Sequence, residues 1–348
     1  MNITIFKRWN NYRIVKRGFE RDSKIGETLL GIPLMVKPNI EINNFEIDDS
    51  RYDEDIANFI RKFEKNLKEN FKGVNLSLFY NNMNTLNVKK LNSADELDIK
   101  LVEFGDKDSH PSIDYGAAYN NKMNEVFYFK ISDEELGHEF FHVASSIVMG
   151  DKWYSGFMQE IPVEGKKNTF KCIGKGLMEG YTQILTERYC MTNCSNAYLF
   201  TKFFVGRLEE IIGQDVMERL YLQADLDGLV KELEKYNTRD NIISFIYVLD
   251  KVTNFYLVYE NCDLEGKKIV QYYYALAFKY MRDFLFASLI NKINIEKNNC
   301  DANVGDLKKL MIKFIDNFWV DCSFDGKLYS LLPITDVIKY SSKVRKIK

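Results

Sequence analysis

Histidine, proline and cysteine are scarce in this sequence, which has 3, 5 and 6 of them among 348 residues. The cysteines are too few and too scattered for the disulfide framework of a small secreted protein. Only Cys190 and Cys194 lie close together, and no further cysteine or histidine stands near them to complete a zinc site. We therefore expect reduced structural thiols.

Long apolar runs are missing as well. The stretch from Thr28 to Val36 is mostly apolar, but Gly31 and Pro33 interrupt it. It is far shorter than the roughly 18 apolar residues of a membrane span, and it begins too late for a secretory signal. We expect a cytoplasmic protein without a membrane span. Because the formal net charge is only -2, nucleic acid is not expected as a partner.

The composition and length predict a folded protein of two lobes. Hydrophobic residues make up 46% of the chain and aromatic residues 14%, which is enough for a substantial core. The pattern predicts an N-terminal extension over 1–50, a mixed lobe over 51–195 and a mainly helical lobe over 196–348. The last region has long apolar periodicity and one proline, Pro333.

The mixed lobe is predicted to begin with a helix and short strands. Apolar residues recur at helical spacing from Ser50 onward, and Gly73 follows as a stop. The runs 74–80 and 97–104 look like strands. A hairpin is expected from 116–119 and 125–131, around the turn-forming residues 120–124.

Two further helices and a second hairpin are predicted after it. Ser132 followed by Glu135 is a capping box, so a helix is expected from Asp133 to about Val148, with Gly150 ending it. A hairpin is expected over 153–175 with its turn at 164–168, and another helix near Gly176.

The first of these helices carries the sequence His-Glu-Phe-Phe-His, at residues 138–142. Four residues advance about 6 Å and nearly complete a helical turn, so His138 and His142 point the same way and can bind one metal ion. Glu139 lies beside them and can take a proton from a water molecule that zinc has acidified. A helix that merely happens to carry two histidines is the alternative, but two buried imidazoles on one face are costly without a metal ion.

A catalytic zinc ion usually has three protein ligands and one open position, so a third ligand is needed. Glu179 lies on the polar face of the next predicted helix, with glycines at 176 and 180 that permit close approach. Glu160 is the rival ligand, because its 18-residue spacing from His142 is shorter, but it stands in a strand-like context. His110 is expected in a loop, and Glu164 in an exposed turn. Glu179 is favoured.

These residues resemble the gluzincin zinc peptidases, the thermolysin-like clan, in which H-E-x-x-H is completed by a glutamate on a later helix. The segment Glu179-Gly180-Tyr181-Thr182-Gln183 is similar to the E-x-x-S-D part of the second motif of that clan. The resemblance implies Glu179 as third ligand to one zinc ion per chain and Gln183 in place of an aspartate that orients a ligand histidine. Two departures are the neutral Gln183 and the 37-residue spacing from His142 to Glu179.

The resemblance also implies a fold and an activity. It implies an α+β fold whose zincin-like lobe has a helix, a small twisted, mostly antiparallel sheet and the H-E-x-x-H helix, beside a mainly helical second lobe. The activity is a zinc metallopeptidase with peptide or protein substrates and Glu139 as general base. A Tyr or His of the second lobe stabilises the oxyanion in such enzymes, and Tyr236, Tyr247 and His110 are candidates by position. The predicted hairpin of 116–119 and 126–129 is expected to end in an edge strand that could pair with an extended peptide. An ordinary sheet edge without such a role is the alternative.

Two other functions remain open at this point. The chain could be a regulatory or binding protein that kept a zincin fold and turns over little, or acts on one dedicated target. It could also hold a structural zinc ion, with Glu160 or Cys172 as a fourth ligand. An intact Glu139 argues against a pure binding module, which has no use for a general base.

Overall fold

The computed structural model describes residues 46–103, 116–130, 132–150, 152–162, 170–190, 198–260 and 264–298, together with 305, 309, 312, 323–324 and 327–328. The described chain is mostly helical and carries small sheets, which agrees with the α+β class at a coarse level. Two compact units divide it. The described residues of one fall within Ile32–Lys202 and Gly213–Leu229, and those of the other within Phe203–Ile212 and Val230–Lys348. The predicted lobe boundaries stay a prediction.

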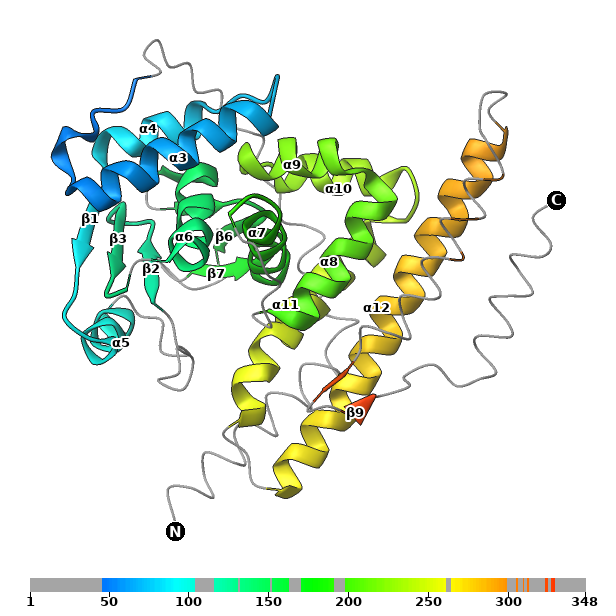
Figure 1. Cartoon of the computed structure of the whole chain (residues 1–348). Helices are drawn as coiled ribbons and strands as arrows, with labels where there is room; N and C mark the ends of the chain where they lie inside the picture. Colours follow the sequence, from blue (N-terminus) through cyan, green and yellow to red (C-terminus); the bar gives the residue numbers. More distant parts are fainter. Residues whose placement is uncertain are drawn as a thin grey trace. The chain divides into compact units, whose positions relative to one another are not determined.

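The unit with the H-E-x-x-H helix has a mixed order of elements, shown in Figure 1. They are η1 (Asp49–Arg51), α3 (Glu54–Asn70), α4 (Ser77–Thr85), β1 (Asn87–Lys90), α5 (Ala94–Glu103), β2 (Ala117–Asn120), β3 (Glu125–Tyr128), α6 (Asp133–Ser145), β4 (Ser146–Met149), β5 (Lys152–Ser155), β6 (Met158–Pro162), β7 (Phe170–Ile173), α7 (Lys175–Tyr189) and α9 (Gln214–Leu222). The helices α8 (Leu199–Ile212) and α10 (Leu226–Glu234) each contribute their first turn.

The first predicted helix is confirmed as α3, and its apolar stripe is its buried face. The stripe residues are all at most 6% exposed: Ile56, Phe59, Ile60, Phe63 and Leu67. The helix begins later than Ser50, because the side chain of Asp53 accepts a hydrogen bond from the backbone N–H of Ile56 (3.0 Å) and caps it. Ser50 lies in the short turn η1 instead.

Aromatic rings of α3 support α6. The ring of Phe63 lies 5.6 Å from that of Phe140 and 5.0 Å from that of Phe141, both in edge-to-face contact. Phe59 makes the same kind of contact with Phe140 at 5.0 Å. Because these rings are fully or nearly fully buried, the position of α6 depends on this cluster.

We expect Phe63→Ala to lower the free energy of unfolding by about 3–5 kcal/mol, since it opens a cavity beside α6. Chemical denaturation of both proteins measures this. The control is Ile99→Ala, because that side chain is 58% exposed and its loss should cost no more than about 0.5 kcal/mol. Equal effects of the two substitutions would contradict the proposed core.

The predicted hairpin is confirmed as β2 and β3, which pair antiparallel with Ala117 opposite Tyr128 and Asn120 opposite Glu125. β1 adds to β3 in parallel, so the strand order is β1-β3-β2 and β2 forms one edge. Helix α6 packs against β2. This arrangement places a sheet edge directly beside the H-E-x-x-H helix.

The strands predicted over 74–80 and 97–104 are wrong, since the structure has helices α4 and α5 there. α4 is buried on most sides, so its apolar residues form a continuous run that resembles a buried strand. The side chain of Asn75 accepts a hydrogen bond from the backbone N–H of Ser77 (2.8 Å) at the start of α4. Ser93 does the same for Glu96 (3.3 Å) at the start of α5.

The predicted end of α6 near Val148 is also wrong: the helix ends at Ser145, and β4 follows at once. The amide of Asn82, on α4, donates hydrogen bonds to the backbone carbonyls of Val143 and Ser146, both at 2.7 Å. These bonds satisfy carbonyls that the last helical turn leaves open. The end of α6 is therefore set by a residue distant in sequence.

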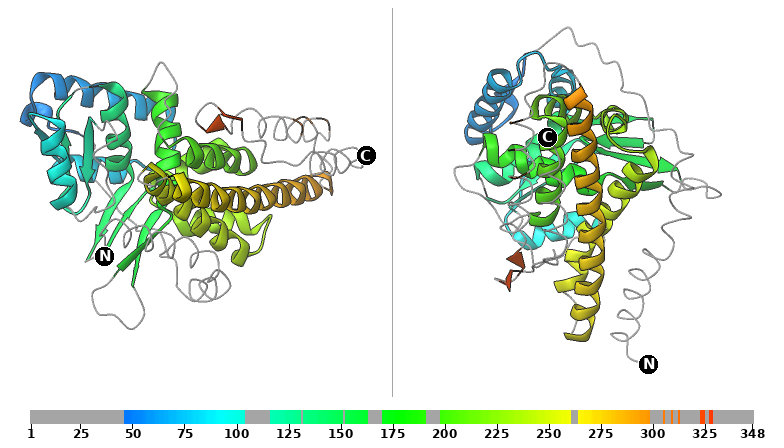
Figure 2. Two further views of the ribbon diagram at one scale, coloured as in Figure 1. Left: turned by 90° about the horizontal axis from the view of Figure 1, so that it is seen from below. Right: turned by 90° about the vertical axis from the view of Figure 1, so that its right-hand side faces the viewer.

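A second sheet occupies the chain between α6 and α7. Its four strands have the order β4-β5-β6-β7 and pair antiparallel (Figure 2). The predicted pairing within 153–175 is confirmed for β6 and β7, where Gln159 lies opposite Ile173, and its predicted turn at 164–168 lies outside the described residues. The β4–β5 and β5–β6 connections were not predicted. This sheet is built from residues between α6 and α7, and it accounts for the 37-residue spacing from His142 to Glu179.

The other unit is mainly helical, as predicted for the C-terminal region. Its main elements are α11 (Arg239–Glu260) and α12 (Leu264–Asn298), which pack against each other. The rings of Phe245 and Phe284 stack at 4.4 Å, and Asn237 donates a hydrogen bond to Ser288 at 3.0 Å. Strands β8 (Ser323–Phe324) and β9 (Lys327–Leu328) form a short pair. Within the described residues, no helix combines the length and the apolar character that crossing a bilayer requires.

Candidate metal centre

Helix α6 presents both histidines of the H-E-x-x-H sequence on one face. Its start is capped as predicted, because the hydroxyl of Ser132 accepts a hydrogen bond from the backbone N–H of Glu135 (3.1 Å). The rings of His138 and His142 lie 4.8 Å apart, inclined at 74°. The two ring nitrogens Nε2 therefore reach the same region from consecutive turns of the helix.

Helix α7 brings a carboxylate to that region. It begins after Gly174, whose backbone has φ +87°, and a side chain there would overlap the carbonyl of Phe157. Gly180 lets the first turn of α8 approach closely, since an added Cβ would lie 2.7 Å from the backbone carbon of Thr201. Glu179, beside that glycine, is directed at α6.

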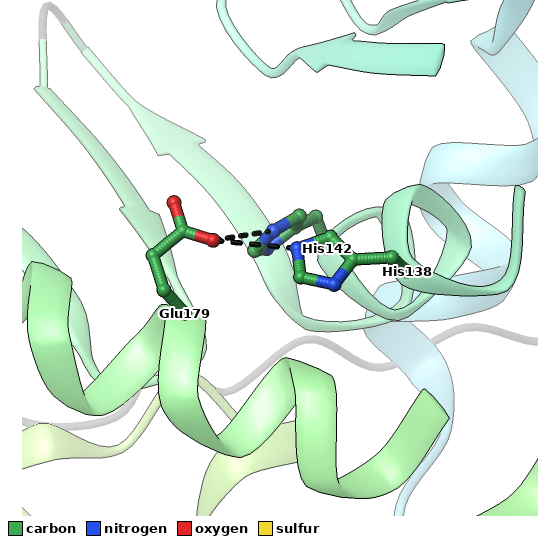
Figure 3. Close-up of side chains that lie close together, drawn as sticks. All are labelled: His138, His142 and Glu179. Atoms are coloured by element: carbon green, nitrogen blue, oxygen red, sulfur yellow. Dashed lines mark hydrogen bonds and ion pairs between the residues drawn. The ribbon is translucent and has the colours of Figure 1, made fainter. Parts of the chain in front are cut away.

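One oxygen of Glu179 faces both histidines, as the dashed lines in Figure 3 show. Its Oε2 lies 3.3 Å from Nε2 of His138 and 3.5 Å from Nε2 of His142. Two atoms bound at about 2.0–2.1 Å to one tetrahedral ion lie about 3.3–3.4 Å apart. The two distances from Glu179 are close to this spacing, and all three ligand atoms lie within 4.8 Å of one another, so the group can hold a metal ion.

The buried carboxylate of Glu179 makes a cation favourable at this point. His138, His142 and Glu179 are 8%, 7% and 9% exposed. Burial alone would raise the pKa of Glu179, but hydrogen bonds with His138 and His142 outweigh it and the pKa falls. Burial alone would lower the pKa of His138, and here Glu179 and Glu139 outweigh it, so that pKa rises. Each group favours the charged form of its neighbour, and a metal ion between them can replace the proton.

The other nitrogen of His138 is held by Gln183, as the resemblance implied. Nδ1 of His138 lies 3.1 Å from the amide oxygen of Gln183, which is 2% exposed on α7. Metal-binding histidines usually make such a bond through the second ring nitrogen, because it fixes the ring orientation. Nδ1 of His142 has no hydrogen-bond partner among the described residues.

Glu139, on α6, is half-buried. Burial raises the pKa of its carboxyl, while His138 and His142 act in the opposite direction. The backbone of Tyr119, on edge strand β2, also acts to lower this pKa. A carboxyl whose pKa is raised by burial is a stronger base than an exposed one, which suits a proton acceptor beside a metal site.

The rival third ligands lie elsewhere or outside the described residues. Glu160 stands on β6 and pairs with Nζ of Lys122 at 3.4 Å, while accepting a hydrogen bond from the backbone of Trp153 at 3.3 Å. Within the described part of the chain, the group that could hold a metal ion contains Glu179 and neither Glu160 nor Cys172. His110 and Glu164 lie outside the described residues.

The tyrosines considered for the oxyanion belong to the mainly helical unit. Tyr247 is 7% exposed on α11, and Nζ of Lys251 lies 5.1 Å above its ring. Tyr236 follows α10, and its backbone carbonyl accepts a hydrogen bond from the Asn291 amide at 2.8 Å. Both have structural partners within their own unit, and their catalytic role stays a prediction.

Sequence reasoning missed a tyrosine that contacts the site. The ring of Tyr198 stacks on that of His138, with centroids 5.4 Å apart and planes inclined at 11°. Its backbone has φ +51°, a conformation that residues other than glycine rarely adopt. No local pattern in the sequence signals such a residue, since the contact joins positions 60 residues apart in the chain.

Comparison with protein-family models, with curated proteins and with solved structures found no match for the chain. The gluzincin resemblance of the two motifs therefore stays a prediction. Function is inferred below from the residues of α6 and α7 and from their contacts.

Proposed function

We propose that this protein is a zinc-dependent metallopeptidase of gluzincin type, which hydrolyses peptide bonds with Glu139 as general base. The observation that carries the proposal is the meeting of His138, His142 and Glu179 at 3.3 and 3.5 Å. A ligand set of two imidazoles and one carboxylate is that of hydrolytic zinc sites. The neighbouring Glu139 supplies the base that such a site requires.

The number of candidate ligands supports a catalytic site over a structural one. The candidate group among the described residues has three members, whereas structural zinc ions are almost always held by four protein ligands. The same ligand types also occur around non-haem iron. A glutamate between the two histidines favours hydrolysis, because it can accept the proton of an attacking water molecule.

The protein's own residues have separate roles in this proposal. When bound, zinc supplies a Lewis acid that acidifies water and polarises a carbonyl. His138, His142 and Glu179 hold the ion. Glu139 accepts a proton from the attacking water at its carboxylate and later returns it to the leaving amine. Burial raises the pKa of this carboxyl, which makes it a stronger base for the first step.

Edge strand β2 offers a place for the substrate backbone. It is unpaired on its outer side among the described strands, and helix α6, which carries Glu139, packs against it. An extended peptide added along β2 would therefore pass close to the general base. This supports a peptide or protein substrate, and a zincin-like arrangement of β2 beside α6.

A peptide-library digest tests the proposal. The protein is reconstituted with zinc and incubated with the library, and products are identified by mass spectrometry. We expect new cleavage products that disappear with a chelator and return when zinc is restored. If zinc-loaded protein cleaves no peptide in a diverse library, or cleaves equally well after chelation, the proposal is wrong.

A further inference from the structure

A line of polar side chains leads from His138 away from the candidate metal centre. The amide oxygen of Gln183 lies 3.1 Å from Nδ1 of His138. The amide nitrogen of Gln183 donates a hydrogen bond to Glu187 at 3.2 Å. Nζ of Lys202 donates to the same oxygen of Glu187 at 2.7 Å. Two side chains, those of Gln183 and Glu187, thus connect a predicted ligand histidine to a lysine at the start of α8.

The helices place these residues in contact. Gln183 and Glu187 are four positions apart on α7, so they share one face of the helix. Lys202 lies in the first turn of α8, which the absence of a side chain at Gly180 allows to approach the α7 backbone. The side chains of Glu187 and Lys202 are 16% and 17% exposed, so their ion pair is largely withdrawn from water.

Glu187 decides which end of the Gln183 amide faces the histidine. An ionised carboxylate only accepts hydrogen bonds, so the NH₂ group of Gln183 must be the end that faces it. The amide oxygen then faces His138 and can only accept. A glutamine without such a neighbour can rotate by half a turn and present NH₂ instead.

The orientation of the amide decides the proton position on His138. Because the oxygen of Gln183 accepts from Nδ1, that nitrogen carries the proton when the ring is neutral. With a proton held on Nδ1, Nε2 is the nitrogen that can offer its lone pair to a metal ion, which would take the place of the proton shared with Glu179 at 3.3 Å. The bond thus leaves free the nitrogen that a metal ion requires.

We propose that Glu187 is a positioning residue that holds the Gln183 amide, and through it His138, in the metal-binding tautomer, with Lys202 holding Glu187 in place. The proposal rests on the proposed metal site. The negative charge of Glu187 lies one helical turn beyond Gln183, whose neutral amide contacts His138. Glu187 touches neither the ion nor the substrate.

Two variants and a control test this role by zinc affinity. Glu187→Ala is expected to weaken zinc binding about 10- to 100-fold, the range for loss of a residue that supports a metal ligand. The exchange Gln183→Glu with Glu187→Gln is expected to restore affinity to within a few-fold of wild type. In that double variant the carboxylate at position 183 accepts from His138 directly, and the amide at position 187 can bridge it to Lys202. Competition with a chelator of known affinity gives the dissociation constants.

Glu218→Ala is the matched control. Glu218 is a buried carboxylate on α9 that binds Arg188 and Tyr189, both at 2.7 Å, in the last turn of α7. Its loss should lower stability without changing zinc affinity. If Glu187→Ala changes affinity no more than this control does, Glu187 has no positioning role.

A readout on metal-free protein separates this proposal from the metal site itself. Nitrogen-15 NMR at a pH where the ring is neutral is measured on proteins that also carry Glu179→Ala, because Glu179 competes for a proton at Nε2 (3.3 Å). It should report the proton on Nδ1 of His138 when Glu187 is present and in the exchange variant. In Glu187→Ala we expect a mixture of the two tautomers. An unchanged tautomer in a folded Glu187→Ala protein would overturn the proposal. Failure of wild type to bind zinc would instead refute the proposed function, while the tautomer result still decides the role of Glu187.

Discussion

Replacing Glu139 by glutamine is expected to reduce peptide hydrolysis by about 10²- to 10⁴-fold, the usual contribution of a general base. The two side chains have nearly the same shape, but an amide cannot accept the proton of the attacking water. The three predicted ligands are untouched, so zinc content should equal that of wild type. The initial rate on a peptide cleaved by wild type, measured beside zinc content, checks both parts.

The matched control for this experiment lies on the same helix. Glu134 is in the first turn of α6, outside the metal group, so Glu134→Gln should retain the wild-type rate. Wild-type hydrolysis by Glu139→Gln would show that another group acts as base. Loss of zinc from Glu139→Gln would show that Glu139 is a ligand, and the division of roles would then be wrong.

Removing Glu179 is expected to abolish the stabilisation that zinc gives the folded protein. An ion that binds only the folded state stabilises it by about 4 kcal/mol when its free concentration is a thousand times its dissociation constant. Glu179→Ala leaves two imidazoles, which hold zinc much more weakly. Thermal unfolding with and without zinc should therefore give a rise in Tm for wild type and little or none for the variant.

The rival ligand supplies the comparison. Glu160→Ala removes a carboxylate of similar burial from β6, where it pairs with Lys122. It should lower Tm in the absence of zinc but preserve the rise on zinc addition. The opposite pattern, with the rise lost in Glu160→Ala and kept in Glu179→Ala, would move the third ligand into the second sheet.

The elements that the sequence predicts well carry a signal within a short stretch of the chain. Ser132 caps α6 through Glu135, three residues away, and the stripe that contains Phe63 and Leu67 forms the buried face of α3. The hairpin of β2 and β3 has turn-forming residues between its strands. In each case the deciding contact joins residues a few positions apart, so a local pattern carries it.

The elements that sequence reasoning missed depend on distant residues. α6 ends at Ser145 because Asn82, more than 60 positions earlier, hydrogen-bonds its last carbonyls. α4 is buried on most sides, so its apolar residues show no helical alternation. Tertiary contacts of this kind override local preference and leave no mark in a short window.

The residues of the candidate site also divide into those with a local sequence signal and those that depend on distant contacts. The spacing of His138 and His142 follows from the helix alone, and the polar face of α7 singled out Glu179. Glu187 could have been found too, since it lies four residues after Gln183 on one helix face. Lys202 and Tyr198 could not, because they reach the site only through the approach of α8 to α7 at Gly180.

Metal analysis of the wild-type protein tests the central claim most directly. The protein, purified and reconstituted with zinc and then freed of unbound metal, is measured by elemental mass spectrometry beside a His138→Ala/His142→Ala double variant. We expect about one zinc ion per chain in wild type and almost none in the folded double variant. Wild type without zinc after reconstitution, or equal zinc in both proteins, would contradict the metal centre on α6 and α7.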